Sequence, residues 1–181
     1  LESLRGYEGS AARVYFQAFQ GMLRDPMGFK GRQKRPPKDP VNVLLSLGYS
    51  LLFKDVCALL DVVGLDPFRA FYHQGRPAYA ALASDMMEEF RAPIVDRAVL
   101  DLVNKRRIQH KHFASSKDGI TLSKEGFALF VEAYRTKLEL CTQYPRTNER
   151  ISYHQCIEGQ IRHLARVILN QDQKYHSFDM G

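Results

Sequence analysis

The sequence predicts an all-α protein in which several helices pack around one central, buried helix. Apolar residues recur at helical spacing along most of the chain, and the run 41–63 is apolar on nearly every face. Proline and glycine separate these stretches from one another. The helical period is lost between about residues 107 and 122, where Lys117-Asp118-Gly119 favours a small β-hairpin or an ordered loop.

Capping residues and helix breakers set the expected boundaries. The first helix is predicted from Tyr7 to Leu23, and the following loop, up to Pro40, contains too many prolines and glycines for regular structure. Asp39 before Pro40 is a favourable start for the central helix, and Gly64 is a favourable end. Further helices are expected at about 66–71, 79–91, 93–106, 123–143 and 147–169, the last capped by Thr147 or Asn148.

The length and composition indicate one globular domain. A chain of 181 residues, 45% hydrophobic and 25% charged, buries a sizeable core, so we expect one domain over 1–170 and a polar carboxy-terminal tail over 171–181. The sequence starts at Leu1 rather than Met, which predicts a fragment of a longer polypeptide. The longest apolar run, Val43 to Phe53, is shorter than the roughly 20 residues that cross a bilayer.

Cysteine usage and charge narrow the class further. The three cysteines are widely spaced without a C-x-x-C pair, which argues against a zinc-finger site or a disulfide framework and favours a reducing cytoplasm.

Two basic stretches, 24–40 and 104–117, together carry a net charge of +9, whereas the rest of the chain carries −3. Such concentration favours binding to a polyanion, because neutralised phosphates release counterions. Solvated loops rich in lysine and arginine are the alternative interpretation.

Four residues form a candidate metal site. Asp85 and Glu88 lie three apart in a predicted helix, so their carboxylates project from one face, and His73 lies in the preceding turn. Glu8 begins the first helix, where a favourable interaction with the helix dipole explains it equally well. Two or three carboxylates with one imidazole suit Mg²⁺ or Mn²⁺. Without further support, ordinary surface acids and a turn histidine remain the simpler interpretation.

The other side chains give little sign of a different chemistry. The sequence has no G-x-S-x-G, P-loop or G-x-G-x-x-G motif, so hydrolase, kinase and dinucleotide-binding classes have no support. The remaining histidines lack acidic or cysteine partners at ligand spacing and are not expected to bind metal; they are His110, His112, His154, His163 and His176.

Three ordered motifs carry a resemblance to a known family. They are RGYEGSAARVYF at 5–16, RPPKDPVNVLLSLGY at 35–49 and DMMEEFRAPIVDR at 85–97. Together, over about residues 1–170, the chain resembles the CRISPR-associated spacer-acquisition integrase and endonuclease family, in its carboxy-terminal catalytic domain. Two departures are a slightly longer segment between His73 and Asp85 and a glutamate at Glu88 where several members have aspartate.

The resemblance implies a site and its roles. Glu8, His73 and Glu88 match the family's ligands of a catalytic Mg²⁺ or Mn²⁺, and Asp85 matches a further acidic position that supports the same catalytic site. DNA or phosphate contacts are implied for four other positions, namely Arg13, Asn42, Arg76 and Arg91.

The resemblance also implies a reaction and partners. The family joins a short double-stranded DNA fragment into a repeat array by attack of a 3′-hydroxyl on a phosphodiester, and the same site cleaves DNA. Its members form homodimers, work with a small ferredoxin-like companion protein, and have an amino-terminal β-domain that this sequence does not include. Some members are fused at the amino terminus to a nuclease or a reverse transcriptase. No membrane partner is expected. The alternatives are a non-catalytic helical DNA-binding or scaffold module and, with less support from the basic stretches, a metal enzyme acting on a small molecule.

Overall fold

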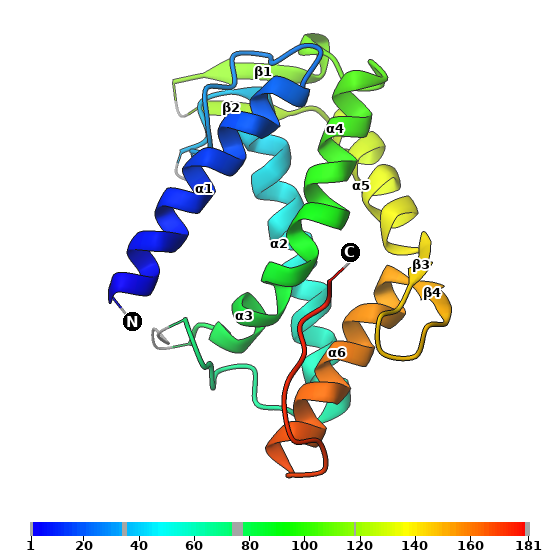
Figure 1. Ribbon diagram of the computed structural model, residues 1–181. Helices are drawn as coiled ribbons and strands as arrows, with labels where there is room; N and C mark the ends of the chain where they lie inside the picture. The colour runs from blue at the N-terminus through cyan, green and yellow to red at the C-terminus, as the bar shows by residue number, and fades with distance from the viewer. Residues whose placement is uncertain (1, 34–35, 74–77, 118, 180–181) are drawn as a thin grey trace. The chain divides into compact units, whose positions relative to one another are not determined.

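The computed structural model describes residues 2–33, 36–73, 78–117 and 119–179 and is mostly helical, which confirms the all-α class (Figure 1). The helices are α1 (Glu2–Met22), α2 (Pro40–Val63), α3 (Ala81–Phe90), α4 (Arg97–Asn104), α5 (Lys124–Leu138) and α6 (Tyr153–Ile168), with a π-helix at Arg91–Asp96 and a 3-10 turn at His110–His112. The strands are β1 (Phe113–Ser116), β2 (Gly119–Leu122), β3 (Cys141–Gln143) and β4 (Arg150–Ser152).

The strands form two antiparallel pairs. In the first pair, β1 with β2, Phe113 lies opposite Leu122, so a hairpin does occupy the segment where the helical period is lost. In the second pair, β3 with β4, Cys141 lies opposite Ser152. The sequence interpretation missed this second hairpin, because three-residue strands are too short to show a period of two.

Helix α2 begins and ends as the sequence predicted. Asp39 caps it, since Oδ1 of Asp39 accepts a hydrogen bond from the backbone N–H of Asn42 at 2.8 Å. Gly64 follows the last turn with a φ of 87°, and the N–H groups of Gly64 and Leu65 both donate to the carbonyl of Leu60. Glycine adopts this left-handed conformation without the steric penalty of a Cβ atom, which explains the helix end.

Contacts within the described chain divide it into two compact units. Unit 1 comprises 1–48 and 96–134, and unit 2 comprises 49–95 and 135–181. The boundaries fall inside α2, the π-helix and α5. Each unit therefore combines segments that are distant in the sequence.

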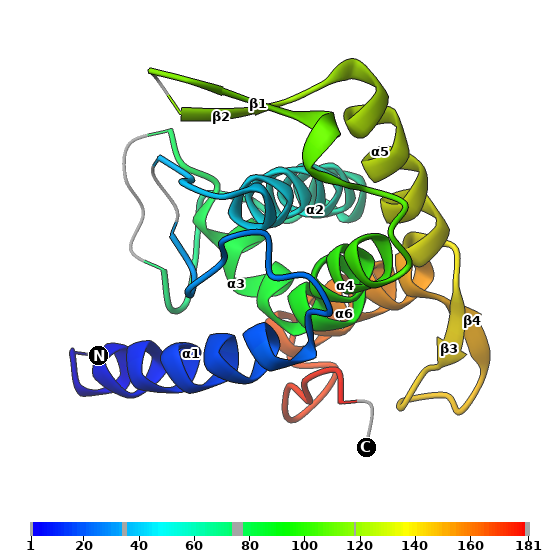
Figure 2. The ribbon, with the colours of Figure 1, turned by 90° about the horizontal axis from the view of Figure 1, so that it is seen from above.

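Aromatic packing holds unit 1 together. Phe19 of α1 and Phe29 of the following loop are fully buried, and their ring centroids lie 5.7 Å apart in an edge-on contact. The long loop after α1 is therefore anchored in the core at Phe29. Tyr15 donates a hydrogen bond of 2.5 Å to Asp96, which is buried at the end of the π-helix. Figure 2 shows α1 in blue and the loop that follows it.

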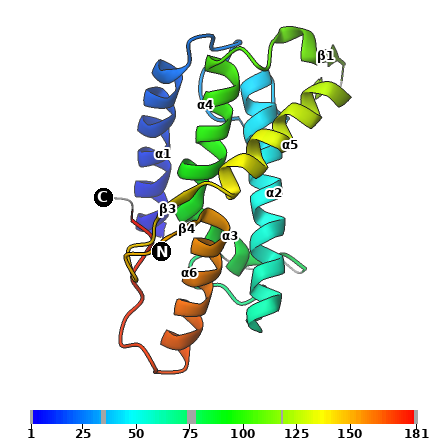
Figure 3. The ribbon, with the colours of Figure 1, turned by 90° about the vertical axis from the view of Figure 1, so that its right-hand side faces the viewer.

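Unit 2 is built from α3, α6 and the segments around them. Met86 and Phe90 of α3 are buried, as are Ile157 and Ile161 of α6. After α6 the chain turns and runs back along that helix, as the red segment of Figure 3 shows. Phe178 near its end is only 8% exposed. The segment expected to be a polar tail thus contributes an aromatic ring to the core of unit 2.

Several expected helix positions are wrong. α1 begins at Glu2 rather than at Tyr7. Residues 66–71 form turns instead of a helix, because Asp66 accepts a hydrogen bond from the N–H of Phe68 and the carbonyl of Pro67 accepts one from Leu82. α5 ends at Leu138, since 141–143 pair as a strand. α6 starts after Ser152, whose hydroxyl and Gln155 form a reciprocal capping box, and neither Thr147 nor Asn148 caps it.

The helix expected to start at Pro93 is instead continuous with α3. Residues Arg91–Asp96 form a π-helix that joins α3 to α4. Proline has no N–H to donate, so the usual i to i−4 bond is lost at Pro93, and the wider π-turn accommodates it. Single-turn π-segments inside α-helices occur frequently at functional sites.

Helix α2 is apolar over a longer stretch than the run Val43 to Phe53 that was compared with the thickness of a bilayer. By length and composition it is sufficient to cross a membrane, in contrast to the expectation that no such stretch exists. Core helices meet the same criterion. Leu44, Leu45, Leu52 and Leu60 of α2 are fully buried, as expected for a helix in a protein core.

Candidate metal centre

An ion pair between His73 and Asp85 organises the candidate site in unit 2. Oδ1 of Asp85 lies 2.7 Å from Nδ1 of His73 and also accepts the backbone N–H of His73 at 2.9 Å. Oδ2 accepts the backbone N–H groups of Phe71 and Tyr72 at 2.8 and 3.0 Å. One carboxylate on α3 therefore fixes both the loop 71–73 and the imidazole ring that the loop carries.

These bonds favour the ionised form of Asp85. Burial opposes ionisation of Asp85, but the hydrogen bonds from Tyr72, His73 and Phe71 outweigh it and hold the pKa of Asp85 below its ordinary value. With Nδ1 of His73 directed at Asp85, Nε2 lies on the opposite side of the ring. The side chain of His73 is 29% exposed. Metal-binding histidines are oriented by carboxylates in the same way.

Glu88 lies one turn after Asp85 on the same face of α3. Its Oε1 atom lies 2.8 Å from an Nη1 atom of Arg91, and the side chain of Glu88 is 36% exposed. The guanidinium of Arg91 stacks over the ring of Tyr49 at 4.9 Å. Among the described residues, the buried Nε of Arg91 has no hydrogen-bond partner. Arg91 therefore carries positive charge beside the carboxylate that the family resemblance implies as a metal ligand.

Unit 2 thus brings together part of the expected site. It places the imidazole of His73, its orienting carboxylate Asp85 and the carboxylate of Glu88 on and beside one helix. This donor set of oxygen and imidazole nitrogen suits Mg²⁺ or Mn²⁺. Glu8 is exposed on α1, which belongs to unit 1. No cluster of three or more His, Cys, Asp or Glu side chains at metal-binding distance occurs among the described residues.

Asn42 has a structural setting in unit 1. It is fully buried, and Oδ1 accepts from Nη1 of Arg32 and from the backbone N–H of Gln33 at 2.9 and 2.8 Å. Nδ2 donates to the carbonyl of Gly31 and to Asp39 at 2.9 and 2.6 Å. These bonds occupy the hydrogen-bonding positions of the amide. Asn42 therefore shapes the basic loop before α2 and has no group left for a phosphate in this arrangement.

The two basic stretches meet in unit 1, although they are far apart in sequence. Nδ2 of Asn104 donates to the carbonyl of Met22, and Oδ1 of Asn104 accepts the N–H of Arg24, both at 2.8 Å. Asn104 thus ties the start of the second stretch to the start of the first. Several cations of the two stretches are exposed, namely Lys30, Lys38, Lys105, Arg106, Lys111 and Lys117. The contacts of Asn104 bring the two stretches together at one point, which supports a shared basic surface rather than two independent loops.

Two further DNA-contact residues implied by the resemblance are Arg13 and Arg76. Arg13 is exposed on α1, and Arg76 lies outside the described residues. Among the remaining histidines, His112 is buried and accepts from the N–H of Gln109, and His163 is fully buried within unit 2. No sequence pattern signalled a role for His163, because its partner Asp172 lies in the segment expected to be a tail.

Comparison with known proteins decides the family. The model of the CRISPR associated protein Cas1 family matches residues 1–136. The chain belongs to the Cas1 family. This confirms the family inferred from the three motifs, and those motifs lie within the matched region.

Curated Cas1 relatives resemble the chain over nearly its whole length. It is 40% identical over 177 residues to the CRISPR-associated endonuclease Cas1 3 of Thermus thermophilus, which covers 98% of the chain and 53% of the relative. It is 41% identical over 184 residues to a CRISPR-associated exonuclease Cas4/endonuclease Cas1 fusion of Geobacter sulfurreducens, covering 98% of the chain and 33% of the fusion. The chain thus spans about half of one Cas1 relative and a third of the fusion.

Solved structures agree with this assignment. A Cas1 protein from Thermotoga maritima is 31% identical, with a TM-score of 0.85 over 98% of the chain and 55% of that protein. A casposase bound to its integration product gives a TM-score of 0.91 at 25% identity, over 99% of the chain and 52% of the casposase. A Cas6-RT-Cas1–Cas2 complex contains a chain with a TM-score of 0.84 at 35% identity, over 99% of this chain and 20% of that one.

Proposed function

We propose that this chain forms the catalytic part of a metal-dependent DNA integrase and endonuclease of CRISPR adaptation. The observation that carries the proposal is the orientation of His73 by Asp85, one helical turn from Glu88. Membership of the Cas1 family supports it, as does similarity to relatives named endonucleases and to a casposase bound to its integration product.

Glu8, His73 and Glu88 would hold one Mg²⁺ or Mn²⁺. Such a cation, when bound, polarises the attacked phosphodiester and makes the attacking hydroxyl more acidic. Asp85, whose pKa is held below its ordinary value, would accept a hydrogen bond from Nδ1 of His73 and keep Nε2 directed away from Asp85, toward the metal. Arg91 adds positive charge next to Glu88, where a phosphate of bound DNA would need to be neutralised.

The proposed reaction is a transesterification. The 3′-hydroxyl of a short DNA fragment attacks a phosphodiester of the repeat array, one P–O bond forms, and one P–O bond breaks. The proton of the attacking hydroxyl is balanced by a proton taken up by the leaving oxygen. Because the number of phosphodiester bonds is unchanged, no energy-rich cofactor is required. Water in place of the 3′-hydroxyl gives cleavage at the same site, which accounts for endonuclease activity.

The basic surface of unit 1 would bind the duplex. Its exposed lysines and arginines contact phosphates without reading sequence, so selectivity would depend on DNA shape and on partner proteins. Homodimer formation and a small ferredoxin-like companion protein are the proposed partners. The Cas6-RT-Cas1–Cas2 complex and the Cas4/Cas1 fusion show that similar chains occur with further proteins or domains. The reducing cytoplasm is the proposed location, consistent with the free thiols of Cys57, Cys141 and Cys156.

The decisive experiment compares Mn²⁺-dependent cleavage and strand transfer on a branched DNA substrate. Full-length wild type is compared with His73→Ala and with the matched control His154→Ala, a histidine in unit 2 outside the His73–Asp85 pair, and folding is checked by circular dichroism. We expect His73→Ala to lose both activities and His154→Ala to retain them. Equal activity of all three proteins would place the chemistry elsewhere. No activity in any of them, with the companion protein present, would favour a non-catalytic DNA-binding or scaffold module.

A further inference from the structure

The segment after α6 is held to unit 2 by both aromatic and polar contacts. Phe178 stacks on Phe90 of α3 with ring centroids 4.9 Å apart, and it meets Tyr153 of α6 edge-on at 6.2 Å. Tyr175 stacks on the buried ring of His163 at 5.0 Å. The segment is thus attached at several points along its length.

Glu89 of α3 is a centre of these contacts. Its Oε1 accepts the hydroxyl of Tyr175 at 2.7 Å, and its Oε2 accepts the N–H of Phe178 at 2.8 Å and Nε2 of Gln160 at 3.0 Å. Burial and the neighbouring Glu89 raise the pKa of Tyr175, so its hydroxyl stays a hydrogen-bond donor. Both carboxylate oxygens of Glu89 are therefore directed at the carboxy-terminal segment and α6.

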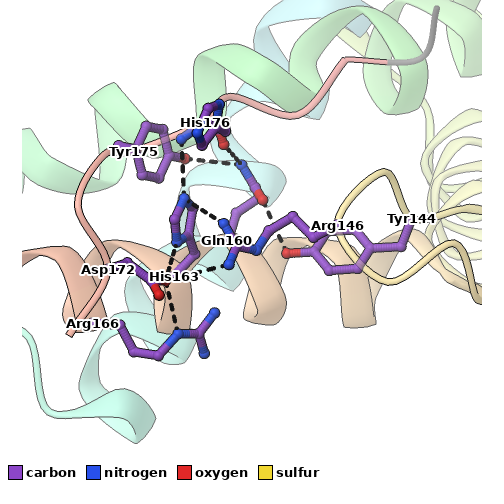
Figure 4. A network of polar contacts seen from close by, with 8 residues as sticks. All are labelled: Tyr144, Arg146, Gln160, His163, Arg166, Asp172, Tyr175 and His176. Atoms are coloured by element: carbon purple, nitrogen blue, oxygen red, sulfur yellow. Dashed lines mark hydrogen bonds and ion pairs between the residues drawn. The ribbon is translucent and has the colours of Figure 1, made fainter.

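Polar side chains of α6 hold the same segment from the other side (Figure 4). Nε2 of Gln160 also lies within 3.1 Å of the Tyr175 hydroxyl and 3.0 Å of the carbonyl of His176, while Oε1 accepts from Tyr144 at 3.0 Å. Nε2 of His163 accepts the N–H of His176 at 3.0 Å. The contacts are specific to these atoms, so the segment has one defined register on α3 and α6.

Helix α3 packs through buried residues such as Met86, Met87 and Phe90, but neither of its ends is fixed by a side-chain cap. It has ten residues, its N-terminus lacks a side-chain cap, and its C-terminus continues directly into the π-helix that contains Pro93. Glu89 lies four residues after Asp85, on the same face of α3, and it directly follows Glu88 in the chain. A shift or rotation of α3 that broke the contacts of Glu89 would move Glu88 with them.

We infer that the segment 172–178 is a strap that positions the metal-binding helix through Glu89. The strap fixes α3 relative to α6, and this keeps the carboxylate of Glu88 aligned with the imidazole that Asp85 orients. Glu89 is thus a positioning residue, which acts on the metal site through the placement of Glu88 and does not bind the metal itself. This inference rests on the proposed function, because it gives the strap a role in the same site.

The test uses the full-length protein and two measurements. Mn²⁺ affinity is measured by electron paramagnetic resonance, and amide hydrogen exchange of α3 is measured without metal. The variants are Glu89→Ala, Tyr175→Phe, the conservative Glu89→Gln, and Lys174→Ala as a control on the exposed side of the strap. Disturbed support of metal ligands typically costs about 10-fold to 100-fold in affinity. We expect Glu89→Ala to weaken Mn²⁺ binding by about 10-fold and to accelerate α3 exchange, with Lys174→Ala unchanged.

The remaining variants keep the inference falsifiable. Glu89→Gln keeps one carbonyl acceptor for the strap and is expected to recover part of the affinity. Tyr175→Phe removes one hydroxyl without creating a cavity. This variant therefore tests the role of the strap even if Glu89→Ala fails to fold. Unchanged Mn²⁺ affinity and α3 exchange in Tyr175→Phe and in a folded Glu89→Ala would overturn the inference. Absence of Mn²⁺ binding by wild type would instead reject the proposed function, and α3 exchange would still report whether the strap holds the helix.

Discussion

Nδ1 of His73 and Oδ1 of Asp85 lie 2.7 Å apart, and the same carboxylate accepts three backbone N–H groups of the loop that carries the histidine. The residues are twelve positions apart, on different elements. Asp85 therefore orients His73, and both of its carboxylate oxygens are already engaged by two hydrogen-bond partners each. Of the three acids of α3, Asp85 thus orients His73, and Glu88 remains the proposed metal ligand.

The substitution Asp85→Asn tests this division. The side-chain NH₂ group of asparagine would lie opposite N–H groups of the loop 71–73, and two donors cannot form a hydrogen bond. We therefore expect His73 to lose its orientation and the affinity for Mn²⁺ to fall by about 10-fold to 100-fold. Titration calorimetry with Mn²⁺ measures the change. Asp61→Asn, at an exposed position of α2, is the matched control and should bind Mn²⁺ as wild type does. Equal affinity of both variants would contradict the orienting role.

Asn42→Ala tests whether Asn42 supports the loop rather than binding DNA directly. The substitution leaves buried partners of the amide, including Asp39 and the N–H of Gln33, without their hydrogen bonds. We expect a loss of about 2–3 kcal/mol in the free energy of unfolding, measured by urea titration. Lys30→Ala, at an exposed position of the same loop, should stay within about 0.5 kcal/mol. A stable Asn42→Ala protein with weakened DNA binding would instead support a direct contact.

Neutralising the basic surface should change DNA binding through salt dependence. We expect Lys30→Gln combined with Lys105→Gln to weaken duplex affinity and to reduce the slope of log K against log salt by about 0.9 for each phosphate that is no longer neutralised. Fluorescence anisotropy over a range of salt concentrations measures this slope. Lys54→Gln combined with Lys174→Gln makes the same charge change at exposed positions of unit 2 and should leave the slope unaltered. Identical slopes for both double variants would reject the basic surface as the DNA-binding site.

Acid should destabilise the strap through His163. Burial lowers the pKa of His163 below its ordinary value of 6.5, and hydrogen bonds, first from Arg166, lower the pKa of Asp172. The charged or titratable groups that face His163 are Asp172, Arg146, Arg166, Tyr175 and His176. As pH falls below about 6.5, His163 is protonated in the unfolded chain but not yet in the folded chain, so the free energy of unfolding falls. The contribution of Asp172 to the free energy of unfolding is lost only below its ordinary pKa of 3.8.

The measurement for this prediction compares urea midpoints at about pH 7.5 and about pH 5.5, on either side of the ordinary pKa of histidine, for wild type and His163→Gln. The variant removes the titrating group, so we expect wild type to lose more stability between the two pH values than the variant does. Differences with pH are compared rather than absolute stabilities, because the substitution itself breaks hydrogen bonds. An equal loss in both proteins would show that protonation of His163 does not contribute.

Local chemistry in the sequence determined the helical class, the start of α2 at Asp39 and Pro40, its end at Gly64, and the family through three motifs. These features depend on periodicity, capping and residue identity, which involve residues close together in the sequence. The motif match also proposed Glu8, His73, Asp85 and Glu88 together. Composition showed two basic stretches, although it did not show that Asn104 joins them.

Tertiary structure alone decided what each polar group faces. Asn42 uses its amide inside the loop, Asp85 orients His73, and Glu89 holds a carboxy-terminal segment that is distant in sequence. Such pairings depend on how helices pack, because a hydrogen bond of about 3 Å requires both chain segments to be placed before the partners can meet. Local sequence patterns specify helices and their ends, whereas tertiary packing decides which partner each carboxylate meets.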